Sequence, residues 1–435
     1  MKRSVGVIGL GYIGLPLALS FCEKGYRVVG VEVNEQKVGQ LIAGYTDVLE
    51  LYEGKPLQDL LQRHLESETF VPTSRAAVAA WEVNAYIVTV GIPVIQGVAD
   101  ETPLLTVAEQ LGKVIKPNDL VLIRSTVIPG ILEDKVIPLL EQHSRMRAGE
   151  DFHVAYAAER VAEGRAMEEF QTLDVVLAGL TDGCYRMAAE LLGDLTSGVI
   201  HRTDLRTAQA VKVIENVQRD VNIALSQQIA WFSEYYGVNV YELIRMANTH
   251  PRVHMLEPSI GVGGFCIPNA YHYLQAGLQP GQRLPLLELA REINETTPER
   301  MIGKLVTQLA MRGKSLRNST IAVLGLGMKD FSNDIRLSPA VRCAEVLIQE
   351  GATVRAFDPT VTLQLPYQVR GLSECLHGAD GLLVATWQHE FEELDFASAL
   401  AHSHVYGVVV DLKRRLRHVA ASTAPDTSDA RVTQS

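Results

Sequence analysis

The stretch Gly9-Leu10-Gly11-Tyr12-Ile13-Gly14, near the start of the chain, has the spacing G-x-G-x-x-G and decides the fold. It lies between an apolar run at 4–9, which predicts a β-strand, and residues 12–24, whose apolar side chains recur at helical spacing. Gly25 provides a stop for that helix, and 27–33 (RVVGVEV) predict a second strand. A strand, a glycine turn, a helix and a strand form a βαβ unit, which indicates a doubly wound α/β domain.

Each glycine of this turn has a physical role if the turn binds a dinucleotide. The first allows the tight turn, the second lets a pyrophosphate approach the backbone, and the third lets the helix pack closely on the strand. The N-terminus of the helix then faces the phosphates. Glu32 closes the second strand, where a carboxylate accepts the adenosine ribose hydroxyls and repels a 2′-phosphate. The pattern therefore predicts NAD as the cofactor; the competing interpretation is a tight turn that binds nothing.

Length and composition set the class of protein. At 435 residues, with 47% hydrophobic and 21% charged residues, the chain is long enough for two or three globular domains. The formal net charge of -11 argues against a nucleic-acid partner, because binding nucleic acid requires a basic surface. The five scattered cysteines include no C-x-x-C pair, which is typical of a reducing cytoplasm. No run of roughly 18 apolar residues could span a bilayer, so we expect a soluble, cytoplasmic protein with no membrane partner.

A long helix follows the first domain. Further buried-strand patterns at 85–90, 120–124 and around 153–157 extend the NAD-binding Rossmann domain, which we expect over 1–203. From Asp204 to Tyr236 the chain has no Gly or Pro and keeps a helical apolar period, which predicts one helix of roughly 30 residues. Thr203 or Asp204 can cap its start and Gly237 its end. We expect a central helical region over 204–311 that carries the dimer surface.

The opening pattern then returns. STIAVLGLG at 319–327 predicts a strand running into a G-x-G turn, and 353–358 predict a second strand ending in an acid. Strand patterns continue at 380–386 and 405–411, so we expect a second Rossmann-like domain over 312–420. The small, polar residues 421–435 predict a disordered tail. The predicted fold class is therefore α/β, with two Rossmann-like doubly wound domains joined by a central helical region with one long helix.

Two groups of residues in the central region carry candidate chemistry. Cys266 directly follows the glycine-dense loop 261–265, which can bring backbone N–H groups and a thiol close to a substrate carbon. An isolated cysteine, however, is usually a small buried hydrophobe. Lys212, Asn216 and Arg219 share one face of the long helix, where a lysine and an amide could hold a developing oxyanion. The competing interpretation of these three is a solvated helix face.

Two charged clusters follow predicted strands. Glu159-Arg160-Val161 opens the segment ERVAEG after the strand near 153–157, and Lys329 and Arg336 follow the second G-x-G turn. Lys329 and Arg336 could hold phosphates or sugar hydroxyls, Arg336 in a bidentate manner. Surface ion pairs are the alternative for both clusters.

With these motifs in this order, the sequence resembles the UDP-glucose/GDP-mannose dehydrogenase family over about residues 3–415. The segments that carry the resemblance are GLGYIGLPLA at 9–18, STVIPG at 125–130, ERVAEG at 159–164, VKVIENVQRDVNIA at 211–224, GVGGFCIP at 261–268 and MKDFSNDIRLSP at 328–339. The segments QRDVNIA and THPRV are most similar to the subgroup that acts on UDP-N-acetylhexosamines. The resemblance implies NAD-dependent, two-step oxidation of the C6 alcohol of a nucleotide sugar to a uronic acid for polysaccharide biosynthesis, by a homodimer or higher homo-oligomer.

The resemblance also implies roles for individual residues. Cys266 would carry the sugar as a thiohemiacetal and then as a thioester. Lys212 and Asn216 would stabilise the oxyanions, and Glu159 and Thr126 would order or activate the hydrolytic water. The implied cofactor-binding residues are Gly9, Gly11, Tyr12, Ile13, Gly14, Glu32, Pro93, Ser125 and Thr126. The implied substrate-binding residues are Arg160, Val161, Lys212, Arg219, Arg252, Gly263, Lys329 and Arg336, with Arg252 reaching across a dimer; no metal is expected.

Three positions depart from the pattern of the family. Ala270 stands where the family has an aspartate four residues after the cysteine, Phe265 replaces a histidine of the subgroup, and Ile92 replaces the threonine of a V-x-T-P turn. A general acid-base carboxylate commonly contributes a factor of roughly 10²–10⁴. Two alternatives therefore stay open: a divergent relative that takes another nucleotide or sugar or stops at the aldehyde, and a non-catalytic protein that binds a nucleotide sugar or NAD.

Overall fold

The structure is a computed structural model that describes residues 4–74, 83–279, 281–362, 364–401, 405, 408–411 and 415–416. The chain divides into two compact units, the first formed by Met1–Val217 and Asn269–Arg283 and the second by Gln218–Pro268 and Leu284–Ser435. Each unit contains an α/β fold built on its own sheet, which confirms the predicted fold class. The predicted tail and part of the predicted strand at 405–411 lie outside the described residues, and the domain boundaries at 203 and 311 stay predictions.

The first unit is built on an eight-stranded sheet with the order β12-β11-β10-β9-β6-β1-β2-β5. Paired neighbours are parallel except β10 and β11. The central strands are buried apolar runs, as expected where helices cover both faces of a parallel sheet. The sequence did not predict β5, β11 and β12, of which β12 (Ile-His-Arg) has no apolar run. The strands are β1 (Ser4–Ile8), β2 (Arg27–Val31), β5 (Phe70–Thr73), β6 (Ala85–Val88), β9 (Leu120–Ile123), β10 (His153–Tyr156), β11 (Val175–Gly179) and β12 (Ile200–Arg202).

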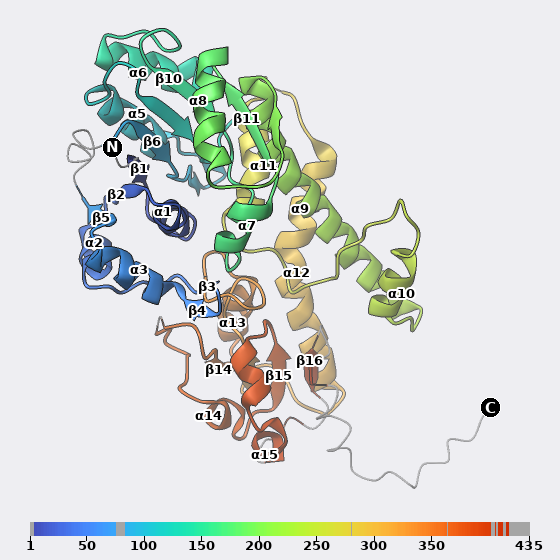
Figure 1. Ribbon diagram of the computed structural model, residues 1–435. Helices are drawn as coiled ribbons and strands as arrows, with labels where there is room; N and C mark the ends of the chain where they lie inside the picture. The colour runs from blue at the N-terminus through green and yellow to red at the C-terminus, as the bar shows by residue number, and fades with distance from the viewer. Residues whose placement is uncertain are drawn as a thin grey trace. The chain divides into compact units, whose positions relative to one another are not determined.

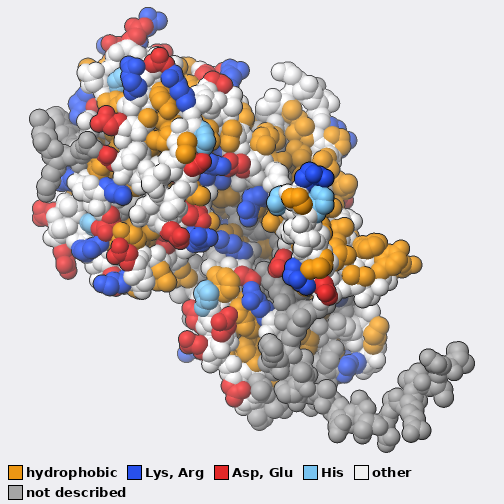
Figure 2. All heavy atoms as spheres, turned by 45° about the vertical axis from the view of Figure 1, so that its right-hand side comes forward, with side chains coloured by type: hydrophobic (Ala, Val, Ile, Leu, Met, Phe, Trp, Pro, Cys, Tyr) orange, Lys and Arg blue, Asp and Glu red, His pale blue; other side chains and the backbone are white. Residues whose placement is uncertain are grey.

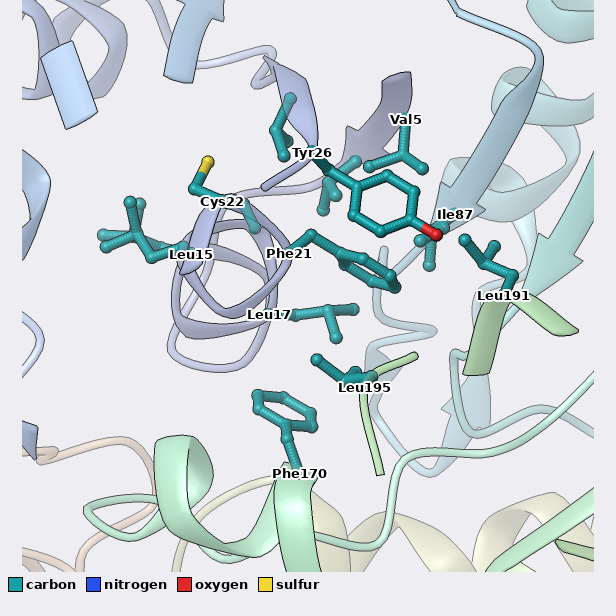
Figure 3. Close-up of a cluster of buried hydrophobic side chains, with 14 of the residues drawn as sticks. Val5, Leu15, Leu17, Phe21, Cys22, Tyr26, Ile87, Phe170, Leu191 and Leu195 are labelled. Carbon is teal, nitrogen blue, oxygen red and sulfur yellow. The ribbon is translucent and has the colours of Figure 1, made fainter. Parts of the chain in front are cut away.

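Helix α1 (Gly14–Glu23) lies at the centre of the core of this unit (Figure 3). The ring of Phe21 meets that of Tyr26 edge to face, with centroids 5.3 Å apart, and Phe170 approaches from α7. This packing fixes the glycine turn that precedes α1. The remaining elements are β3 (Leu51–Tyr52), β4 (Lys55–Pro56), β7 (Val94–Ile95), β8 (Val98–Ala99), α2 (Glu35–Ile42), α3 (Leu57–Glu66), α5 (Thr102–Gly112), η1 (Leu132–Val136), α6 (Ile137–Ser144), α7 (Ala166–Thr172) and α8 (Asp182–Gly193).

The predicted long helix is confirmed as α9 (Leu205–Tyr235) (Figure 1). Asp204 caps its start, because the Asp204 carboxylate accepts the N–H of Thr207 at 2.9 Å. Gly237 follows its end with a φ of 68°, a left-handed conformation that a glycine adopts without strain. The chain passes from the first unit to the second within α9, and back again within α11 (Cys266–Ala276).

The second unit contains a parallel four-stranded sheet with the order β14-β13-β15-β16. The start of β13 and the second G-x-G turn lie where the sequence predicts them, which confirms the second Rossmann-like fold. The elements of this unit outside α9 and α11 are α10 (Val240–Ala247), α12 (Pro285–Ala310), β13 (Thr320–Leu324), α13 (Pro339–Gln349), β14 (Thr353–Phe357), α14 (Leu372–Leu376), β15 (Gly381–Val384), η2 (His389–Glu393), α15 (Phe396–Ala401) and β16 (Val409–Asp411).

Candidate active site

In the first glycine turn, packing requires glycine at one position and leaves open space at another. A Cβ added at Gly14 would lie 1.8 Å from the carbonyl oxygen of Gly9, so helix and strand can pack this closely only with glycine at position 14. Gly9 itself has a φ of 94°, which favours glycine. A Cβ at Gly11 would meet no atom within 4 Å. Because nothing in the protein requires a glycine there, the open space fits the close approach of a pyrophosphate.

The start of α1 and the carboxylate of Glu32 add to this fit. No side chain caps α1, so its N-terminus beside the turn is left open to an anion. Tyr12 and Ile13, which precede the helix, are half-buried. Glu32 accepts the N–H of Leu10 at 3.1 Å, which holds its carboxylate beside the turn. These residues would hold the pyrophosphate and the adenosine ribose of NAD.

The other predicted cofactor residues follow the carboxyl ends of β6 and β9, which are neighbours in the sheet beside β1. Pro93 comes after β6, and Ser125 and Thr126 come directly after β9 and Arg124. Dinucleotides bind outside the carboxyl ends of strands in such sheets. The predicted residues thus share one edge of the sheet with the glycine turn. Ile92, the departure beside Pro93, is buried, and its carbonyl oxygen accepts the hydroxyl of Tyr273.

The carboxylate of Glu159 is held by three donors. One oxygen accepts the backbone N–H of Arg160 at 2.8 Å and that of Val161 at 3.1 Å. The other oxygen forms an ion pair with Arg124, whose side chain is 3% exposed. Each carboxylate oxygen can accept about two hydrogen bonds, so one acceptor direction is left. The sequence alone does not single out Arg124, because Arg124 and Glu159 come from different segments of the chain.

Side chains around Glu159 line a small cavity inside the first unit. Its volume is about 20 Å³, room for one water molecule. Arg124 Nε and Nη1 are buried and have no hydrogen-bond partner within the described part of the chain. Charged donors buried in this way are usually satisfied by water or by a ligand. The lining residues include Arg124, Glu159, Arg160, Val161 and Phe170.

A buried acid, Glu50, lies against the start of α7, the helix that follows the ERVAEG segment. The Glu50 carboxylate accepts the N–H of Met167. Burial raises the pKa of Glu50 to about 7, and the nearby charges of Glu169 and Glu163 act in the same direction while the hydrogen bond from Met167 opposes them. The charge of Glu50 at the start of α7 therefore changes near neutral pH.

The predicted residues on α9 differ in exposure. Asn216 is buried, Lys212 is half-buried and Arg219 is exposed. Lys212 forms no ion pair within the described residues, whereas the guanidinium of Arg160 is bound to Glu215 at 2.7 Å. Arg160 also donates to the carbonyl oxygen of Asp174 at 3.0 Å. The guanidinium of Arg160 is therefore already engaged within the first unit.

Cys266 is the first residue of α11 and is exposed. The other four cysteines are buried. Burial raises the pKa of Cys343 and of Cys22 far above the usual thiol range, and that of Cys375 to about 12, so these three stay protonated and unreactive. Exposure thus singles out the one cysteine that the sequence selected from its glycine loop.

The predicted substrate residues of the second unit fall into two groups. Lys329 and Arg252 are exposed. Arg336 is half-buried, and its guanidinium Nε donates to both carboxylate oxygens of Asp334 at 2.8 Å. Gly263 lies in the glycine loop before Cys266, where an added Cβ would lie 2.7 Å from the carbonyl oxygen of Leu337. The loop therefore packs on the turn that carries Arg336.

The catalytic and binding residues that the sequence predicts are divided between the two units. Glu159, Thr126, Lys212 and Asn216 belong to the first, whereas Cys266 belongs to the second together with Arg219, Arg252, Gly263, Lys329 and Arg336. Among the described residues, no group of three or more His, Cys, Asp or Glu could hold a metal ion. No helix in the described part of the chain is both long and apolar enough to cross a membrane.

Comparison with known protein families identifies the family of the chain. The UDP-glucose/GDP-mannose dehydrogenase family matches in three parts: its NAD binding domain at residues 3–195, its central domain at 206–296 and its UDP binding domain at 322–418. The chain therefore belongs to the UDP-glucose/GDP-mannose dehydrogenase family, and its cofactor is NAD. This confirms the prediction of an NAD-dependent nucleotide-sugar dehydrogenase.

Individual relatives cover nearly the whole chain. A UDP-N-acetyl-D-mannosamine dehydrogenase from Pyrococcus horikoshii is 34% identical over 94% of each chain. An NDP-N-acetyl-D-galactosaminuronic acid dehydrogenase from Ralstonia solanacearum is 32% identical over 90% of this chain and 92% of its own. A solved structure of the UDP-D-ManNAc dehydrogenase from Pyrococcus horikoshii matches with a TM-score of 0.85 at 33% identity, over 93% of this chain and 94% of that one.

Proposed function

We propose that the protein oxidises the C6 primary alcohol of a UDP-N-acetylhexosamine to the uronic acid, with Cys266 as the covalent nucleophile. The observation that carries the proposal is the placement of Cys266, an exposed thiol that begins α11 directly after a tightly packed glycine loop. The names of the similar dehydrogenases support an N-acetylhexosamine as the sugar.

In the proposal, Cys266 is bonded to C6 of the sugar at two successive oxidation states. NAD, held by the glycine turn and Glu32, would supply the hydride acceptor for each oxidation. After the first oxidation, Cys266 Sγ forms a bond to C6 of the aldehyde, and the thiol proton passes to the aldehyde oxygen to give a thiohemiacetal. After the second, C6 is a thioester carbon; water then adds to it, and the C–S bond breaks to release the acid and the thiol.

The remaining residues support these steps in the proposal. Lys212 and Asn216 stabilise the negative charge that develops on the C6 oxygen. Glu159 keeps one acceptor direction for the hydrolytic water, and Thr126 helps to order it. Lys329 supplies an exposed positive charge for the diphosphate. The wider set proposed to bind substrate is Arg160, Val161, Arg219, Arg252, Gly263 and Arg336.

The test is Cys266→Ser. A hydroxyl is a far weaker nucleophile than a thiolate at neutral pH, so this variant should form no detectable acid, while its NAD affinity stays unchanged. Cys184→Ser is the matched control, because Cys184 is buried in the NAD-binding fold. Near-normal acid production by Cys266→Ser would remove the covalent role.

A second candidate function is favoured by Ala270. Its side chain is fully buried, at 0% exposure, on the helix that Cys266 begins, so the usual carboxylate is missing there. An enzyme without it could take another nucleotide or sugar, or stop at the aldehyde. Turnover of a panel of sugar nucleotides, with NADH counted per substrate, separates the candidates: two equivalents for the acid and one for the aldehyde.

We also propose that the protein is a homodimer or a higher homo-oligomer. The right-hand part of the face drawn in Figure 2 shows many hydrophobic side chains, and an exposed apolar patch of this kind usually marks an interaction site. In the second unit, the large exposed hydrophobic residues on or beside α9, α10 and α12 include Leu225, Phe232, Tyr235, Tyr236, Val238, Met246, Leu286, Leu289, Val306 and Met311. Sedimentation of the parent and of Phe232→Glu tests this, and a parent that is monomeric at micromolar concentration would contradict it.

A further inference from the structure

The cysteine loop and the turn that carries Arg336 form one packed element within the second unit. A Cβ added at Gly264 would lie 2.4 Å from the sulfur of Met328, and Gly264 has a φ of 72°. The Gly264 N–H donates to the carbonyl oxygen of Arg336 at 2.8 Å. The turn is closed by the Met328 N–H, which donates to the carbonyl oxygen of Asp334 at 2.7 Å. Two motifs far apart in the sequence thus share backbone contacts directly before Cys266.

The guanidinium of Arg336 is fixed from two sides. Asp334, whose side chain is 2% exposed, binds its edge in the bidentate manner described above. The ring of Phe265 lies against it, with the guanidinium carbon 4.9 Å from the ring centroid, a distance at which cation–π attraction acts. Phe265 is 39% exposed, so burial in a core does not explain its ring.

We propose that Phe265 is a positioning residue that ties the loop ending at Cys266 to Arg336. The ring sets the plane of the Arg336 guanidinium, and the hydrogen bond from Gly264 to Arg336 passes this constraint to the loop. The inference rests on the proposed function, in which Cys266 carries the sugar and Arg336 binds the nucleotide sugar. Loosening either side of the pair therefore disturbs the position of the sugar relative to the thiol.

Substitutions that keep or remove the aromatic ring test this directly. Phe265→Tyr keeps the ring, so its kcat/KM should stay within about twofold of the parent. Phe265→Leu fills similar space without a ring, and its kcat/KM should fall by about two- to fivefold. In the Arg336→Gln background the same leucine substitution should have little further effect, because the positive charge that meets the ring is gone. Equal values for tyrosine and leucine, or an equal loss in both backgrounds, would overturn the proposal.

Phe265→His gives a readout that a merely structural role would not change. Imidazole has an ordinary pKa of about 6.5, so at pH 5.5 it is largely charged and faces the positive guanidinium, whereas at pH 8 it is neutral. The Asp334 carboxylate is the nearby opposite charge and is engaged with Arg336. The ratio of variant to parent kcat/KM should fall by about two- to fivefold from pH 8 to pH 5.5. A ratio that does not change with pH would count against the pairing.

Hydrogen exchange separates this inference from the proposed function. In the free protein, Phe265→Leu should speed exchange of the Gly264 amide by about two- to fivefold relative to the parent, and Phe265→Tyr should not. If the parent formed no NADH from any UDP-sugar, the proposed function would fail while this measurement still decided the role of Phe265. Unchanged exchange in Phe265→Leu would overturn that role.

Discussion

The chain contains two G-x-G turns, one after β1 and one after β13. Protein atoms occupy the space beside both glycines only at the second turn. At both, an acid at the end of the second strand accepts turn N–H groups: Glu32 from Leu10, and Asp358 from Leu326 at 2.8 Å. At the second turn, Cβ atoms at Gly325 and Gly327 would lie 2.2 and 2.0 Å from carbonyl oxygens of the protein.

The helices that follow the two turns differ in the capping of their N-termini. Ser338 caps α13 by accepting the N–H groups of Ala340 and Val341, and its hydroxyl also donates to the carbonyl oxygen of Leu326. Helix α1 has no side-chain cap and begins at the turn itself. A G-x-G turn alone therefore does not make a dinucleotide site. An uncapped helix N-terminus beside the turn, with open space at the second glycine, is also required.

The largest effect is expected for a substitution in the first turn. Gly14→Ala should destabilise the NAD-binding fold by several kcal/mol, on the order of 3 or more, because its Cβ meets the carbonyl oxygen of Gly9. Gly11→Ala is the matched control, since its Cβ meets nothing in the protein and should weaken NAD binding without lowering the melting temperature. Thermal melting and NAD titration check the pair. A Gly11→Ala variant that binds NAD normally would show that the pyrophosphate does not approach there.

A smaller effect is expected at the second turn. Asp358 is buried, and its carboxylate also accepts from Gln388 at 3.1 Å and from the N–H of Thr360 at 2.9 Å. Asp358→Ala leaves these donors unpaired and should lower the free energy of unfolding by about 2–4 kcal/mol. Its NAD dissociation constant should equal that of the parent in titrations at low temperature. A large loss of NAD affinity would mean that the second turn also takes part in NAD binding.

Glu32→Ala is the counterpart at the open turn. Glu32 is partly exposed and accepts from Leu10 and Asn34, so its loss should change stability little. NAD affinity should fall by about tenfold, and discrimination against NADP should weaken, because the carboxylate no longer binds the ribose or repels a 2′-phosphate. Dissociation constants for both nucleotides check this. If NAD affinity did not change, the assignment of the cofactor site would be wrong.

The last expected effect is a pH dependence of stability within the N-terminal fold. The pKa of Glu50 is about 7 in the folded protein, above its ordinary value of 4.5, so the folded state binds the proton more tightly than the unfolded chain. The stability from this group is present below about pH 4.5 and is lost as pH rises through about 7. The gain in unfolding free energy of Glu50→Gln over the parent should therefore be larger at pH 8 than at pH 5, by ~1–3 kcal/mol. Exposed Glu53→Gln is the control, and an equal pH slope in both variants would contradict the role of Glu50.

Local sequence patterns predicted the features that depend on neighbours in the chain. The open turn, the caps of α9 and the glycine loop before Cys266 all lie within short segments, so spacing and residue type suffice to find them. The pairs Arg124–Glu159 and Phe265–Arg336 join segments that only the folded sheet and turns bring together. No periodicity signals such pairs. The exposure of Cys266 and the burial of Ala270 are likewise set by packing, which residue type alone does not give.

In the proposed function, Cys266 carries the sugar through two oxidations. Rapid mixing of enzyme, UDP-N-acetylhexosamine and NAD, followed by intact-mass spectrometry, tests it most directly. We expect two NADH per sugar converted, a burst of NADH before the steady state, and a transient sugar-nucleotide adduct on Cys266 that is absent in Cys266→Ser. Release of free aldehyde with one NADH per sugar, or formation of the acid by Cys266→Ser, would contradict it.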